Sequence, residues 1–134
     1  MILKIIIGLA LLLIGMKLFV SGVKPLANTS FMETISNPYL IFAIAGGGTL
    51  LWQSSSITTA VLVGMVGGGL PLEAGMIGII GANIGTTGTA LLASITAGKA
   101  GLQLAVFHAT FNVIGALVVL PFVGIIARYI KMVV

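Results

Sequence analysis

The sequence predicts an all-α integral membrane protein with three membrane-crossing helices and a re-entrant helical hairpin. Of its 134 residues, 59% are hydrophobic and 6% are charged, and the mean hydropathy is +1.29. Such a chain has too little polar surface to cover a soluble globule. A span needs about 20 mostly apolar residues, and uncharged stretches of at least that length separate Glu33, Glu73, Lys99 and Arg128. Three or four membrane segments are therefore available.

The composition also excludes several classes of function. The absence of cysteine rules out disulfides and thiolate metal sites. One histidine and two widely separated glutamates cannot form an acid/base pair, a nucleophile triad or a metal cluster, so we expect no enzyme. The six basic residues lie mainly near segment ends, where Lys and Arg reach the membrane interface. They do not indicate nucleic-acid binding.

The first membrane segment is expected at residues 2–23. Lys4 before an apolar run is also found in signal peptides, but a signal peptide would release a soluble remainder. The remainder here is more apolar than the start, so we predict a span. In residues 25–37, polar and apolar side chains alternate, which suits a short amphipathic helix in the interface.

Residues 39–70 are predicted to form the re-entrant hairpin. The turn signal Asn37-Pro38 directs the chain back toward the membrane. Two apolar arms of roughly 10–13 residues then flank the polar run from Gln53 to Ser56, and each arm would be roughly 15–20 Å long as helix. This length is too short to cross ~30 Å of hydrocarbon. Non-helical backbone at this depth must be buried in protein or line a wet cavity.

The third segment, residues 72–95, is expected to be a broken span. Gly81, Gly85 and Gly88 surround Asn83, and each glycine costs about 1 kcal/mol relative to alanine inside a helix. We therefore expect an unwound middle. The fourth segment, residues 101–127, is predicted to be a continuous span with Pro121 toward its end.

Hydroxyl and amide side chains gather at both expected breaks. In secondary transporters, interrupted hydrophobic segments are the best sequence pointer to the substrate site. Half-helix N-termini favour an oxyanion such as phosphate, whereas neutral oxygens suit sodium, a hard cation. No Arg or Lys lies in either cluster, so we expect the anion to bind together with sodium. The expected substrate contacts are Gln53, Ser54, Ser55, Ser56, Asn83, Thr86 and Thr87, and the expected sodium contacts are Gln53, Ser55, Thr58, Thr59, Asn83, Gly85 and Thr86; Thr89 lies in the second cluster.

Two motifs carry a resemblance to a known family. Gln-Ser-Ser-Ser-Ile-Thr-Thr at 53–59 and Gly-Ala-Asn-Ile-Gly-Thr-Thr at 81–87 resemble the paired signature of the type II sodium/phosphate cotransporters and their bacterial relatives. Further stretches resemble the same family repeat, so the likeness covers nearly the whole chain; they are residues 8–22, Asn37-Pro38, Thr49, His108-x-x-Phe111-Asn112 and Pro121. The resemblance implies sodium-coupled transport of inorganic phosphate or a similar oxyanion, with sodium as coupling ion and no organic cofactor.

The resemblance also implies an assembly. The family carries two repeats of opposite orientation whose hairpins meet at a shared central site, whereas this chain contains one. We therefore expect a half-transporter that pairs in inverted orientation with a second copy, or with a separate partner half. The difference in the number of Lys and Arg residues between the short loops on the two sides of the membrane sets the orientation of a membrane protein. This difference is small here. One side carries Lys4 and Lys99, and the other carries Lys24, Arg128 and Lys131, with Lys17 nearby. This balance predicts a dual-topology homodimer. Separately, we expect a multi-pass protein of the cell membrane, in a bacterial or archaeal inner membrane.

Several alternatives stay open. A sodium-independent anion channel or an accessory membrane subunit is possible on composition, although two discrete polar breaks favour a closed site over a continuous pore. His108 and Asn112 share one helical face and are expected to brace the hairpins, with proton shuttling as the alternative. Trp52 is either a lid over the site or a packing residue. Glu73 suits a helix N-terminus better than a sodium site.

Overall fold

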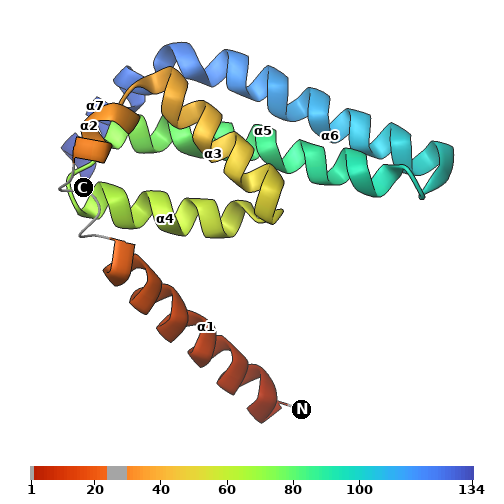
Figure 1. The fold of residues 1–134 in the computed structure, drawn as a ribbon, viewed down its shortest axis with the longest axis horizontal. Coiled ribbons are helices and arrows are strands. Elements are labelled where there is room, and N and C mark those ends of the chain that lie inside the picture. The colour runs from red at the N-terminus through yellow and green to blue at the C-terminus, as the bar shows by residue number, and fades with distance from the viewer. Residues whose placement is uncertain (1, 24–29) are drawn as a thin grey trace.

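The computed structural model describes residues 2–23 and 30–134, and this part of the chain contains helices and no strands (Figure 1). The helices are α1 (Ile2–Val23), α2 (Ser30–Ile35), α3 (Pro38–Trp52), α4 (Ser55–Gly67), α5 (Leu72–Ser94), α6 (Gly98–Val119) and α7 (Val123–Val133), with a 3-10 turn, η2 (Leu120–Phe122), between the last two. The all-α prediction is confirmed. Residues 25–29 of the predicted interfacial segment 25–37 lie outside the described residues, and α2 is the helical part that the structure describes.

Two stretches of the described chain are long and apolar enough to cross a bilayer, namely α5 and the continuous run Gly98–Val133. α5 and α6 run side by side in opposite directions, and α1 projects away from the other helices (Figure 1). All the side chains of α1 that the structure describes are exposed, and its contacts are with α4. A span at α1 therefore stays a prediction.

The two short arms predicted around Gln53 are the helices α3 and α4. Asn37 begins α3, because its side-chain oxygen accepts hydrogen bonds from the N–H groups of Tyr39 and Leu40 at 3.0 and 3.2 Å. Both arms pack on α5, and their tip stops well short of the α5–α6 connection (Figure 1). The predicted break between the two arms is confirmed, because α3 ends at Trp52 and α4 begins at Ser55. That the hairpin enters and leaves a membrane on one face stays a prediction.

The predicted break in the third segment is wrong, because α5 runs without interruption from Leu72 to Ser94. Its glycines serve close packing against α3. A Cβ atom on Gly81 would meet the Phe42 carbonyl, and one on Gly85 would meet the Gly46 carbonyl. A Cβ on Gly46 would in turn lie 3.0 Å from the Gly81 oxygen. Small residues at such a contact let two helix backbones approach closely, and this packing offsets the low helix propensity of glycine.

Two hydroxyl groups of the expected break, those of Thr86 and Thr87, are satisfied within α5. Thr86 Oγ1 donates to the carbonyl of Ala82 at 3.0 Å, and Thr87 Oγ1 donates to the carbonyl of Ile84 at 2.7 Å. Such back-bonding is a common use of Ser and Thr in helix interiors. The polar run at 83–87 therefore does not require an unwound backbone.

The main apolar core lies between the hairpin and the first half of α5. It consists of Ile35, Ile41, Ala45, Leu62, Met65, Leu70 and Ala74. Ile35 brings α2 into this core, and Leu70 closes the turn after α4 by donating its N–H to the Met65 carbonyl at 2.9 Å. The core therefore fixes the base of the hairpin and leaves its tip outside.

The fourth segment is not a single regular helix to residue 127, as predicted, but turns at η2. Pro121 lacks a backbone N–H, so it interrupts the helical hydrogen bonding at this point. α7 then packs against α5 with Val123 and Ala127 buried. The spanning part of the segment, α6, ends at Val119.

We predict that Gly85→Ala destabilises the protein by about 1–3 kcal/mol, because the new methyl group overlaps the α3 backbone. Thermal unfolding in detergent should show a lower Tm. The matched control is Gly115→Ala in α6, where a Cβ meets nothing within 4 Å; its Tm should be unchanged or higher. Equal Tm values for both variants would contradict the α3–α5 packing.

Candidate functional site

The tip of the hairpin contains a strained residue. Gln53 ends α3 with φ 53° and ψ 34°, in the left-handed region, and no other non-glycine residue of the described chain has a positive φ. Glycine usually takes this position after a helix, because a side chain there costs roughly 1–2 kcal/mol. Strain of this kind is concentrated at functional sites. The Gln53 side chain is exposed, so packing does not explain its presence.

The serine run begins the second arm. Ser54 is the N-cap of α4, and its hydroxyl accepts a hydrogen bond from the Ile57 N–H at 3.4 Å. The first N–H groups of a helix have no carbonyl partner within it, so those of Ser55 and Ser56 point out of the end of α4. The last carbonyls of α3 are left over in the same way. The tip thus joins the partly negative end of one helix to the partly positive end of the next.

The side chains of Thr49, Trp52 and Thr58 form a hydrogen-bonded polar cluster next to the tip. Thr49 and Thr58 are 0% and 4% exposed, and their hydroxyl oxygens are 2.6 Å apart. The Trp52 indole N–H donates to Thr58 Oγ1 at 3.0 Å and to the Ser54 carbonyl at 3.2 Å. The Trp52 side chain therefore bridges the two arms by hydrogen bonds. Thr49 was absent from the expected contacts, although a lone hydroxyl in an apolar arm near the break was a usable signal.

The second predicted cluster does not face the tip. Gly81, Gly85 and Gly88 lie against Phe42, Gly46 and Leu50, respectively. In this register of α3 against α5, Gly88 lies beside Leu50. The tip begins about one helical turn after Leu50, so it lies beside residues that follow Gly88 in α5. Asn83 is exposed. It lies two residues from both Gly81 and Gly85, which corresponds to a rotation of about 200° around the helix axis, so it is on the side of α5 away from α3.

Thr89 brings a further hydroxyl to the hairpin side of α5. It follows Gly88 and lies three helical turns from Gly78, which packs against Leu62 and Ile41. Its oxygen is buried and has no hydrogen-bond partner within the described chain. A buried hydroxyl without a partner is unfavourable, so Thr89 is a candidate ligand contact. The sequence placed it in the second cluster without distinguishing it from its neighbours.

The remaining predicted contacts are spread around the first turn of α4. Ser55 and Thr59 are half-buried, whereas Ser56 is exposed. Among the residues that the structure describes, no three acidic or histidine side chains gather as metal ligands. Glu73 lies in the first turn of α5, as expected for a carboxylate at a helix N-terminus. A cation at the tip would therefore be held by neutral hydroxyl, amide and carbonyl oxygens, a set that suits a hard ion.

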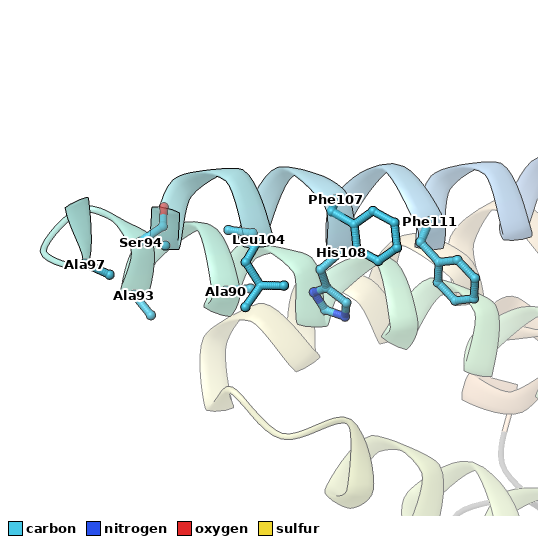
Figure 2. Close-up of a pocket in the computed structure, with 10 residues that line it drawn as sticks. Ala90, Ala93, Ser94, Ala97, Leu104, Phe107, His108 and Phe111 are labelled. Carbon is cyan, nitrogen blue, oxygen red and sulfur yellow. The ribbon is translucent and has the colours of Figure 1, made fainter. Parts of the chain in front are cut away.

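His108 and Asn112 lie elsewhere, on α6. His108 lines a groove of about 520 Å³ between α5 and α6, together with alanine, leucine and phenylalanine side chains (Figure 2). Asn112 donates to the carbonyl of His108 at 2.9 Å, within its own helix. In the described part of the chain, neither side chain hydrogen-bonds to the hairpin, so the expected bracing contacts are not present.

We predict that Gln53→Gly raises thermal stability by about 1 kcal/mol, because glycine adopts the left-handed conformation without steric cost. The measurement is the Tm of the purified protein in detergent. Gln53→Ala keeps a Cβ atom in the same conformation and serves as the control, with no comparable gain. A lower Tm for Gln53→Gly than for Gln53→Ala would show that the residue is not strained.

Comparison with known proteins places this geometry in context. The model of the Na+/Pi-cotransporter family matches residues 11–132. The bovine sodium-dependent phosphate transport protein 2B is 34% identical over 106 residues, which are 74% of this chain and 15% of that protein. The mouse sodium-dependent phosphate transport protein 2C is 38% identical over 103 residues, 72% of this chain and 17% of that protein. The uncharacterized protein YqeW of Bacillus subtilis is 34% identical over 84 residues, 62% of this chain and 27% of that protein.

The matched region contains both sequence motifs and the whole hairpin. The chain spans only about 15% of the length of the bovine relative and 27% of YqeW. No solved structure matches the chain significantly. The extent of the family match, which includes all of α3 to α6, nevertheless establishes that the chain belongs to the Na+/Pi-cotransporter family, a family of membrane transporters and not of enzymes.

Proposed function

We propose that this chain is one half of a sodium-coupled phosphate transporter and that the tip at residues 53–56 is its binding element. One observation carries the proposal. The tip places an anion-favouring helix end and a cation-favouring helix end within two residues of each other. A site that binds phosphate and sodium together needs both.

Phosphate binding is assigned to the α4 side of the tip. The N–H groups at the start of α4 and the hydroxyls of Ser54, Ser55 and Ser56 are hydrogen-bond donors, and a helix N-terminus favours an anion. No lysine or arginine lies in residues 38–98. Bound phosphate would therefore keep most of its charge unless a cation neutralised it, which supports coupling to sodium.

Sodium binding is assigned to the α3 side. Terminal carbonyls of α3, the Gln53 amide oxygen and the hydroxyls around Thr58 supply neutral oxygens there. The buried Thr89 hydroxyl is a further oxygen on this side of α5. Two mammalian relatives are named sodium-dependent phosphate transport proteins, which supports the proposal that this chain handles both ions.

The half-transporter assignment rests on uncovered polar groups. Gln53 and Ser56 are exposed at the tip, and polar groups at membrane depth must be buried in protein or face a wet cavity. A second, antiparallel copy would cover one tip with the other and build a two-fold site. Asn83, which faces away from its own hairpin, then becomes available to the partner's site.

The test of function is phosphate uptake into proteoliposomes. We expect radiolabelled phosphate to accumulate under an inward sodium gradient and not under an equal choline gradient. Ser54→Ala should lower uptake about tenfold, the effect of losing one charge-assisted hydrogen bond, whereas Ser94→Ala, whose hydroxyl bonds to the Leu91 carbonyl of its own helix, should not. Uptake without sodium would indicate a pore, and no uptake would indicate an accessory subunit.

The assembly makes a separate prediction. The chain contains no cysteine, so single substitutions at two exposed positions, Ala100→Cys and Val134→Cys, introduce unique labels at the α5–α6 connection and the C-terminus. In sealed inside-out and right-side-out vesicles, an impermeant maleimide should reach about half of each label from either face, because the Lys/Arg bias is small. Labelling of each position from one face only would rule out the antiparallel homodimer.

A further inference from the structure

We propose that the Trp52 indole N–H occupies the cation position at the tip, and that sodium must displace the indole in order to bind. This inference rests on the proposed function, since it concerns the same site. It assigns to Trp52 a role that neither the two sequence motifs nor the family match contains. Trp52 is thereby a positioning residue that sets the sodium affinity of the tip.

The argument begins with two converging oxygen atoms. Thr58 Oγ1 donates a hydrogen bond to the Ser54 carbonyl at 3.4 Å, and the indole N–H donates to these same two oxygens, at 3.0 Å to Thr58 Oγ1 and 3.2 Å to the Ser54 carbonyl. The N–H dipole points its positive end between two neutral acceptors. A small hard cation is attracted to the same arrangement of oxygens. The indole therefore occupies the place that sodium would take, and the two cannot be there together.

A third oxygen completes the arrangement. Thr49 Oγ1 lies 2.6 Å from Thr58 Oγ1, on the buried side of the pair. A hydroxyl has one donor and two acceptor sites, so Thr58 can donate to the Ser54 carbonyl, accept from Thr49 and still offer one lone pair to a partner. The indole N–H fills this acceptor site. When the indole leaves, the Thr58 lone pair and the Ser54 carbonyl become available to a cation.

The surroundings of the ring allow this exchange. The indole folds back over Gly48, where a Cβ atom would lie 2.7 Å from the ring carbon Cη2. Trp52 and Thr58 also line a cavity of about 150 Å³ between the two arms. The ring is half-exposed. It can therefore rotate away from the two oxygens without movement of α3 or α4.

Gly48 provides a variant that acts on the indole alone. Gly48→Ala forces the ring out of its position and removes no polar group from the site. Gly47→Ala is the matched control, because a Cβ there meets nothing within 4 Å in the same helix. Trp52→Phe is the second variant, since it keeps an aromatic ring and deletes the N–H donor.

The experiment uses the fact that Trp52 is the sole tryptophan. We would titrate the full chain in detergent with NaCl at constant ionic strength, balanced with choline chloride, and follow tryptophan emission alongside binding of radiolabelled sodium. The wild type and Gly47→Ala should show a saturable sodium-specific emission change with the same midpoint as sodium binding. Gly48→Ala and Trp52→Phe should bind sodium at a midpoint about fivefold lower, which corresponds to the loss of one competing hydrogen bond.

The outcomes separate this inference from the proposed function. Saturable sodium binding without an emission change, or with equal midpoints in Gly48→Ala, Trp52→Phe and Gly47→Ala, overturns the role of Trp52 and leaves sodium-coupled transport standing. The absence of both sodium binding and sodium-driven phosphate uptake overturns the proposed function and this inference together.

Discussion

The fold depends on the close approach of the α3 and α5 backbones. Gly46, Gly81 and Gly85 contribute no Cβ atoms to the crossing, and backbone carbonyls of Phe42, Gly46 and Gly81 occupy the space that their side chains would need. In a bilayer the hydrophobic effect does little to bring helices together, so contact of this kind supplies much of the packing energy. It holds the hairpin against α5, and it determines the level along α5 at which the tip stops.

The same contact explains where sequence analysis succeeded and where it failed. The break at Gln53 and Ser54 was predictable because arm length and polar clustering are local properties. The continuity of α5 was not predictable. Glycine destabilises an isolated helix, but it stabilises a helix that packs closely against a neighbour, because the neighbour occupies the space of the missing side chain. Only the identity of the facing residues, Phe42 and Gly46, decides between these effects. The turn at Pro121 was not predicted, because proline limits a helix but does not indicate where the chain goes next.

The candidate site shows a similar division. Gln53 and the serine run were predicted from residue type alone, and they lie where α3 ends and α4 begins. Their role in binding stays a prediction. The cluster of Thr49, Trp52 and Thr58 depends on a turn that folds one arm over the other, and no spacing rule along a single helix describes such contacts. Asn83 has suitable chemistry but lies on the side of α5 away from the tip, because the predicted unwinding that would have turned it is absent.

The depth of the tip has a consequence for the response to voltage. If α5 crosses the whole membrane, the shorter arms of the hairpin end inside the electric field (Figure 1). Moving one elementary charge across the entire field changes its energy by about 2.3 kcal/mol per 100 mV. An ion that binds at the tip passes through only part of that drop. The number of helical turns in α3 and α4 thus determines what fraction of the membrane potential acts on occupancy of the site.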